Sequence, residues 1–522
     1  MKPANDLFLL IKSLHKGEKR FFKLYARKYE KDANYLRLFE AIDRQHEYDE
    51  QALKETFKND KFAQRLSVTK EYLYEMILCS LRNYGTEVSP EMEVLALRRD
   101  IKTLISKRLY RQAEKLIVKA KELALQYDLF HELLGILGDE AYLPWKDREE
   151  MFREWRDVLD KFNNMYEFGY FAEQVRAITE NKRYLRSPED FAEINEIEKK
   201  YAKDVREATS FSSKLRYYFA HTMLNTLKNN GDEKLKNARA TVGLFHEYPQ
   251  FIQTQTLAYL SELRTYSAIE LAQGNYEKAL QSIQTLKQTE VPAQFLPFKK
   301  ILLFFIEQNY ALATLKFERF AEFELQYNEL SGTYPHELAS YGVAIELKFL
   351  SNFAYAYFAV GRYGDALKKL NILLARPDLA QHPYFENNVR LLYLIVHYEI
   401  GNFDLLEYLI RSTYRAFLKR KQLFAFEKCF LRHIRRLSVI DDTVALRRWL
   451  QALYDEIRVL SADPQEAAFL KKYNYPAWIE SKLTGQKFLD VLKRKQESKR
   501  ELKKAALPQP NIPSEFYRQT AE

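Results

Sequence analysis

A short segment recurs along the 522-residue chain, and its regular spacing constrains the fold more than any other feature. Each copy has a turn or small residue, an aromatic residue two positions on, and a small or apolar residue three further on, as in "LAQGNYEKALQSI" (271–283) and "AVGRYGDALKKL" (359–370). The small or apolar position falls at Ala238, Ala279, Phe323, Ala366, Leu406 and Ala445, which are 41, 44, 43, 40 and 39 residues apart. A period near 40 residues is typical of solenoids built from helix pairs.

The unit around Gly361 shows why each copy predicts two helices. Apolar residues before the glycine follow helical spacing at positions 350, 353, 354 and 357, and a second set follows it at 363, 366, 367, 370 and 373. Gly361 and Gly364 lack the spacing and the preceding strand of a phosphate-binding loop. We therefore expect Gly361, Gly274 and Gly401 just past a helix C-terminus, where a left-handed backbone favours glycine.

The order of residues in this unit resembles the tetratricopeptide repeat (TPR). The resemblance is carried by Leu350, Phe353, Ala354, Tyr357, Gly361, Tyr363, Ala366, Leu370 and Pro377, and in a second unit by Leu263, Gly274, Tyr276, Ala279, Ile283 and Pro292. It implies an all-α fold, a right-handed α-solenoid of about nine TPR-like helix pairs with repeats lengthened beyond the usual 34 residues. We expect the solenoid over 91–460, a small helical N-terminal region over 1–90, capping helices over 461–505 and a disordered tail over 506–522.

The composition and the absence of known catalytic motifs limit the classes of function that the sequence supports. With only Cys79 and Cys429, and with no signal sequence or membrane-length apolar run, the chain is expected to be cytoplasmic without membrane insertion. The two His-Glu pairs, at His131 and His336, lack the second histidine of a His-Glu-x-x-His metal motif. No Gly-x-Ser-x-Gly elbow is present. These observations favour a non-enzymatic protein with no catalytic residue, cofactor or metal.

The resemblance to TPR proteins implies a partner-binding groove on the concave face. The first-helix residues expected to face inward are Arg264, Gln308, Lys316, Lys348, Ser351, Tyr355 and Asn388. The paired Lys and Asn positions of members that bind peptide carboxylates do not recur. We therefore expect a protein or peptide partner whose class stays open.

A second candidate contact is electrostatic. The formal net charge is +10, and residues 411–450 hold eleven Lys and Arg against three acids. Basic residues recur at helical spacing in two neighbouring segments, which predicts a patch of Arg411, Arg415, Lys419, Lys428, Arg432, Arg435 and Arg436. An acidic protein segment is the expected partner, with a merely solvated face, nucleic acid or an anionic surface as alternatives.

Residues 62–85 suggest a different function. They have the outline of a helix-turn-helix, with a turn at Ser67 and Val68 and a second helix opened by Thr69. The DNA contacts in that case are Arg65, Thr69, Lys70 and Tyr74. Glu71 and Glu75 lie on the same polar face and would repel phosphates. A transcriptional regulator with this N-terminal module and a TPR-like sensor domain is the alternative to a protein-binding scaffold.

Overall fold

The computed structural model describes residues 4–29, 34–85, 89–181, 185, 188–201, 203–340, 343–420, 422–437, 440, 442–470 and 473–505. These residues form α-helices and short 3₁₀-helices, and no β-strand occurs among them. No helix in the described part of the chain is both long and apolar enough to cross a membrane. The all-α prediction is therefore confirmed. The predicted tail at 506–522 lies outside the described residues.

The helices follow one another closely along the chain. The first group is α1 (Ala4–Ser13), α2 (Lys16–Tyr29), α3 (Asn34–Arg44), α4 (Glu50–Thr56), η1 (Lys61–Arg65) and α5 (Leu66–Gly85). The second is α6 (Pro90–Ser106), α7 (Tyr110–Gln126), α8 (Phe130–Glu140), α9 (Arg148–Asn181), α10 (Pro188–Tyr201), η2 (Val205–Glu207), α11 (Phe211–Leu227) and α12 (Gly231–Glu247).

The second half of the chain continues in the same way. It begins with α13 (Gln250–Thr254), α14 (Thr256–Ala272), α15 (Tyr276–Gln288), η3 (Ala293–Phe295), α16 (Leu296–Ala313), η4 (Phe317–Arg319), α17 (Phe320–Thr333) and α18 (Pro335–Ser340). It ends with α19 (Val343–Ala359), α20 (Tyr363–Leu374), η5 (Pro377–Gln381), α21 (Pro383–Glu399), α22 (Phe403–Lys419), α23 (Ala425–Leu437), α24 (Thr443–Leu460), α25 (Pro464–Leu470), α26 (Tyr475–Thr484) and α27 (Phe488–Ala505).

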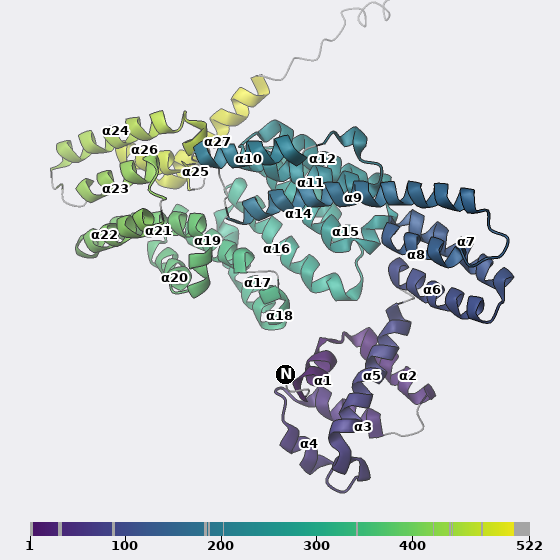
Figure 1. Ribbon diagram of the computed structural model, residues 1–522. Coiled ribbons are helices and arrows are strands. Elements are labelled where there is room, and N and C mark those ends of the chain that lie inside the picture. Colours follow the sequence, from purple (N-terminus) through teal and green to yellow (C-terminus); the bar gives the residue numbers. More distant parts are fainter. Residues whose placement is uncertain are drawn as a thin grey trace, which may run out of the picture.

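From α6 onward, helices pack mainly against their neighbours in the chain. The pairs α6 with α7, α11 with α12, α14 with α15 and α19 with α20 are each in close contact, and α12, α14, α16, α19 and α21 link one pair to the next. Figure 1 shows the result as an elongated array that runs from α6 to α24. A pair of amphipathic helices cannot bury both apolar stripes alone, so stacking of neighbours supplies the core.

The same backbone turn joins the two helices of successive pairs. A left-handed residue follows the first helix at Arg108, Asn229, Gly274, Leu315, Gly361 and Gly401, with φ between 56° and 79°. At Gly361 the next residue, Arg362, donates its N–H to the Tyr357 carbonyl at 2.8 Å, and Gly361 donates to Phe358 at 3.0 Å. These two bonds define a Schellman motif. The turn predicted at Gly274, Gly361 and Gly401 is confirmed.

The N-terminal helices have a core of their own. Residues from α1 to α5, among them Leu7, Phe22, Phe39, Leu73 and Ile77, form one buried apolar cluster that is separate from the clusters of the array. Figure 1 shows α1 to α5 as a body beside the array, reached through α5 and α6. The predicted turn at Ser67 and Val68 is absent, because both residues lie inside the unbroken α5. The predicted position of the turn is therefore wrong.

The last helices do not simply cap the array. Helix α27 was expected to cover its end, but Gln496 of α27 donates to the Tyr276 hydroxyl at 2.8 Å and to the Ala313 carbonyl at 2.6 Å. Phe488 of the same helix packs against Tyr355 and Phe358 of α19, with ring centroids 6.4 and 5.2 Å apart. The apolar side of α27 thus returns to helices from the middle of the chain.

Candidate functional site

The predicted groove residues lie on α14, α16, α19 and α21 and beside η4, and most of them are buried. Gln308, Ser351, Tyr355 and Asn388 are only 0%, 1%, 7% and 6% exposed. Arg264 and Lys348 are half-buried, and Lys316 is exposed. The structure therefore brings these residues to neighbouring helices but leaves few of them open to a partner.

Residues 473–496, here called the C-terminal segment, contact two of these buried residues, Ser351 and Tyr355. The Tyr473 hydroxyl lies 2.6 Å from the Ser351 hydroxyl, and the Asn474 amide donates to the Tyr355 hydroxyl at 3.0 Å. The Tyr355 and Tyr473 rings also pack together, with centroids 5.3 Å apart. Burial raises the pKa of Tyr355 and so favours the protonated hydroxyl, whose oxygen accepts this bond. The segment therefore occupies the part of the predicted groove formed by Ser351 and Tyr355.

Further contacts fix the C-terminal segment to α21. The Trp478 indole donates to Glu399 at 2.6 Å, and Lys482 forms an ion pair with the other oxygen of that carboxylate. Trp478 is 1% exposed, and its ring meets Tyr398 edge-on at 5.9 Å. We call the side of α16, α19 and α21 beneath this segment the covered face. Ser351, Tyr355 and Glu399 on this face each bind a side chain of the C-terminal segment.

The half-buried cations of the predicted groove share one aromatic ring. The Arg264 guanidinium lies 5.9 Å and the Lys348 ammonium 5.8 Å from the centroid of Phe305 on α16. Such cation–π contacts place both charges beside α16. Lys316 lies in the same way 6.0 Å from the Tyr310 ring. Arg264 and Lys348 thus join α14 and α19 to α16.

A cavity of about 250 Å³ remains beside the C-terminal segment. Apolar residues of α14 and α16, including Leu271 and Leu312, form one wall, and Asn352, Tyr355 and Asn474 supply polar groups. Asn352 donates its amide to Gln308 Oε1 at 2.9 Å, while Gln308 Nε2 is buried and has no hydrogen-bond partner in the described part of the chain. The cavity is large enough for one side chain rather than for a whole peptide.

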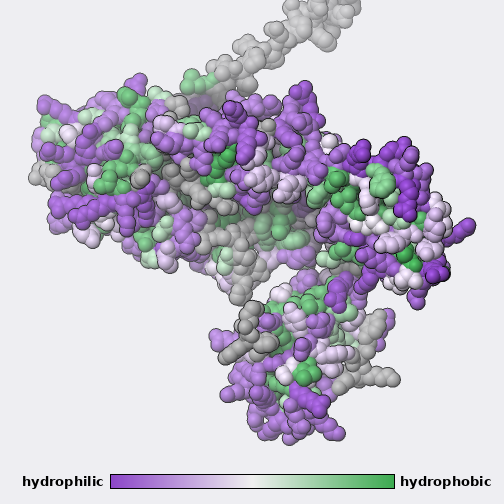
Figure 2. Space-filling view, viewed as in Figure 1, coloured by the Kyte–Doolittle hydropathy of each residue, from purple (hydrophilic) through white to green (hydrophobic). Residues whose placement is uncertain are grey.

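The predicted basic patch is exposed, in contrast to the groove. We call Arg411, Arg415, Lys419, Lys428, Arg432, Arg435 and Arg436 the basic surface; all seven side chains are exposed on α22 and α23. Glu407 joins the two helices, since it accepts from Arg411 at 2.6 Å and lies 3.8 Å from Arg435. Figure 2 shows a mostly hydrophilic surface over these helices. The expected merging of the two stripes does occur at Glu407.

Several cations of the basic surface lack an ion-pair partner in the described part of the chain. Arg415, Lys419, Lys428 and Arg436 form no ion pair with other described residues. Exposed apolar and aromatic side chains lie on the same helix, α22, with Tyr408 68% and Leu418 57% exposed. Arginine and tyrosine are enriched among the residues that dominate protein interfaces. This mixture suits a protein ligand better than a bare phosphate chain.

Most of the residues predicted to contact DNA are not exposed on the surface. Thr69 and Lys70 are buried, and the Lys70 ammonium binds Glu50 at 2.8 Å and the Tyr48 hydroxyl at 3.0 Å. Those bonds and the neighbouring charges raise the pKa of Lys70 even though burial opposes the charged form. Tyr74 packs on the N-terminal core, and only Arg65 is exposed. Lys70 and Thr69 are therefore turned away from any DNA backbone.

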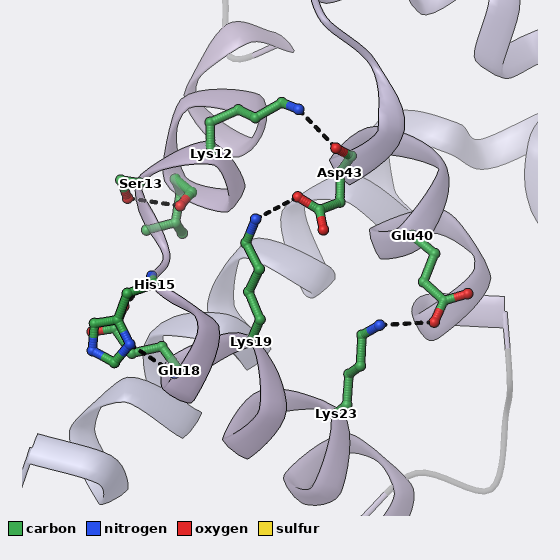
Figure 3. Close-up of polar contacts among 9 residues, drawn as sticks. Lys12, Ser13, His15, Glu18, Lys19, Lys23, Glu40 and Asp43 are labelled. Carbon is green, nitrogen blue, oxygen red and sulfur yellow. Dashed lines mark hydrogen bonds and ion pairs between the residues drawn. The ribbon is translucent and has the colours of Figure 1, made fainter. Parts of the chain in front are cut away.

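Other cations of this body also have internal partners. Figure 3 shows Lys19 pointing to Asp43 and Lys23 to Glu40, at 2.6 and 3.0 Å, while Lys12 donates to the Asp43 carbonyl at 2.7 Å. On α2, Lys16, Arg20 and Arg27 line an open hollow of about 440 Å³. This second basic surface, here called the α2 surface, was not predicted from the sequence.

One cluster of metal-binding side chains lies under the basic surface. Cys429 and His433 of α23 and Glu456 of α24 place their donor atoms within 4.8 Å of one another. Burial, together with the nearby Glu456 carboxylate, raises the pKa of Cys429 to about 12, and burial lowers the pKa of His433. This cluster was not predicted from the sequence. Its only signal is the four-residue step from Cys429 to His433, because Glu456 comes from another helix.

Comparison with known protein families finds none whose pattern matches this chain, and comparison with curated proteins finds no matching sequence.

Proposed function

We propose that this chain is a non-enzymatic protein-binding scaffold, a TPR-like right-handed α-solenoid of about nine helix pairs that binds an acidic protein segment. The observation that carries the proposal is the basic surface. It combines four exposed cations that have no ion-pair partner in the described part of the chain with the exposed side chains Tyr408 and Leu418. The resemblance to TPR proteins and the recurring Schellman turns support the scaffold architecture.

The physical basis of binding is charge complementarity between an acidic segment and exposed cations that other described residues do not pair. Arg411 and Arg435 already share Glu407, so the carboxylates of a partner are expected to approach the other cations of α22 and α23. Complementary charge raises the association rate and selects partners, while buried aromatic and apolar contacts supply most of the affinity. The cavity beside Asn352 and Tyr355 is a second candidate contact, sized for a single side chain of the partner.

The first experiment measures binding of a fluorescein-labelled poly-glutamate peptide to the full chain by fluorescence anisotropy over a salt series. We expect binding at low salt that weakens as salt rises, because the contacts are charged. The test variant is Arg415→Glu with Lys419→Glu, two exposed residues four apart on α22. Reversing both charges is expected to weaken binding about 10-fold or more.

Two matched variants control for net charge. Lys16→Glu with Arg20→Glu makes the same change on the α2 surface, and Arg111→Glu with Lys115→Glu makes it at exposed positions of α7. Neither is expected to weaken binding as much as the α22 variant. Equal losses in all three variants, or no binding by the wild type at low salt, would contradict the proposal. Tighter binding of a labelled single-stranded oligonucleotide would indicate nucleic acid as the partner instead.

A further inference from the structure

Three side chains with metal-binding donor atoms converge between α23 and α24. Cys429 and His433 are four residues apart on α23, so they lie one above the other on the same face of the helix. Glu456 comes from α24, which packs against α23. Its Oε2 lies 3.0 Å from His433 Nε2, and the three donor atoms lie within 4.8 Å of one another.

Two of the three side chains in the cluster are buried, and Glu456 is partly exposed. Cys429 and His433 are each 3% exposed. The Trp449 ring packs on His433 with centroids 4.8 Å apart, and the Trp449 indole donates to the His433 carbonyl at 3.2 Å. These contacts hold the imidazole with Nε2 directed toward Glu456. A buried, oriented thiol and imidazole beside a carboxylate is more than apolar packing requires.

We propose that Cys429, His433 and Glu456 bind one zinc ion that ties α23 to α24. A thiolate, an imidazole and a carboxylate are all zinc ligands, and three protein ligands leave a fourth position for water. The thiolate and the carboxylate together balance the double positive charge of the ion. When Cys429 binds, its thiol proton passes to solvent. The donor atoms already share one small volume, so binding requires small inward movements of the ligands and withdrawal of Arg432 Nη2, which lies 3.4 Å from His433 Nε2.

Arg432 supplies the partner that holds the carboxylate. One nitrogen of its guanidinium, Nη2, lies 2.6 Å from Oε1 and 2.5 Å from Oε2 of Glu456. One oxygen can therefore move to the metal while the other stays bound to Arg432. Such hydrogen-bonded partners of metal ligands are a regular part of metal sites. Arg432 also belongs to the basic surface, so the ion would fix the helix that carries half of that surface.

Cobalt substitution tests the site directly. The reduced full chain is titrated with Co²⁺ and followed by absorption spectroscopy. We expect one equivalent to bind with a thiolate-to-cobalt charge-transfer band and the visible bands of tetrahedral cobalt, and Zn²⁺ to abolish both. Cys429→Ser should lose the charge-transfer band. Cys79→Ser should keep it, because Cys79 lies in the N-terminal body, 3.0 Å from the Tyr25 hydroxyl.

Because Cys429→Ser changes a buried residue and could disturb folding, a second variant changes the more exposed ligand, Glu456. Glu456→Gln keeps the size of the side chain and should weaken Co²⁺ binding at least about 10-fold, because even the partners of metal ligands contribute that much. Absence of the charge-transfer band in the wild type would overturn the proposal. The same holds if the band survives Cys429→Ser, if Cys79→Ser removes it, or if Glu456→Gln binds Co²⁺ as tightly as the wild type.

Discussion

The covered face and the basic surface belong to the same array of helices, but they differ in whether their polar side chains have partners within the chain. On the covered face, Ser351 and Tyr355 find partners in Tyr473 and Asn474 of the same chain. On the basic surface, Arg415 and Lys419 remain exposed and form no ion pair with other described residues. The difference teaches that a polar side chain is open to a ligand only when its own chain has not already satisfied it.

Among the substitutions that test this comparison, Trp478→Ala is expected to have the largest effect on stability. Trp478→Ala should lower the free energy of unfolding by about 3–5 kcal/mol, because it removes a fully buried aromatic side chain and leaves the Glu399 carboxylate without its indole donor. Urea denaturation of the full chain measures the change.

Trp145 is the matched control for Trp478. Its indole also donates to a glutamate, Glu114 at 2.9 Å, but its side chain is 51% exposed. Trp145→Ala should therefore cost about 1 kcal/mol or less. Equal costs for the two variants would show that the C-terminal segment contributes little to the covered face.

A pH titration compares a buried with an exposed carboxylate. Glu262 of α14 is 8% exposed, and burial raises its pKa from 4.5 to about 7. Between these values the folded chain keeps a proton that the unfolded chain has lost, so stability falls as pH rises through this window. Below pH 4.5 there is no cost, and above pH 7 the cost is fully present, about 3 kcal/mol.

Glu262→Gln removes this cost. The variant should match the wild type near pH 4.5 and become more stable than it by up to about 3 kcal/mol above pH 7. Thermal denaturation at a series of pH values checks this difference. Glu407→Gln on the basic surface is the control and should change stability by about 0.5 kcal/mol or less. An identical pH profile for wild type and Glu262→Gln would contradict the assignment of Glu262 as a buried acid.

The smallest expected effect on stability concerns the left-handed glycine turn, which occurs in both regions. Gly361 follows α19 of the covered face and Gly401 precedes α22 of the basic surface, with φ of 79° and 76°. Neither glycine has a neighbouring atom that an added Cβ would meet within 4 Å, so alanine introduces backbone strain alone. Each substitution should cost about 1 kcal/mol.

Gly364 provides the control for these turns. It lies three residues after Gly361 but inside α20, with a helical backbone and equally open surroundings. Gly364→Ala should therefore stabilise the chain by up to about 1 kcal/mol, the opposite sign. Chemical denaturation of the three variants measures both effects. A loss of stability at Gly364 as large as that at Gly361 would indicate that φ does not determine the cost.

The sequence was sufficient for the helices and for the turns that use glycine. The spacing of apolar residues around Gly361 predicted the break between α19 and α20, because a left-handed turn residue and amphipathic stripes are local signals. Turns of the same geometry at Arg108 and Leu315 were harder to recognise, since no glycine marks them. Their hydrogen bonds specify the turn, and a non-glycine residue bears the strain.

The candidate sites were predictable only in part. The basic surface follows from the helical spacing of Arg and Lys in 411–436, which is again a local pattern. The covered face was missed because Tyr473 and Asn474 meet residues 119 to 122 positions earlier in the chain, and no local pattern encodes such a contact. A signal was available in "YNYPAWI" (473–479), an aromatic run too apolar for a solvated cap. The cysteine, histidine and glutamate cluster depends in the same way on packing between two helices.

The position of the C-terminal segment also has a consequence for how the chain is made. A ribosome completes α16, α19 and α21 well before it reaches residues 473–496. During that interval Tyr355, Phe358 and Tyr398 have no Phe488 or Trp478 to pack against, and an apolar side of the nascent array stays uncovered. Transiently exposed apolar surface of this kind is where chaperones act and where aggregation begins. Translation of the last helices therefore ends the vulnerable period of the chain's synthesis.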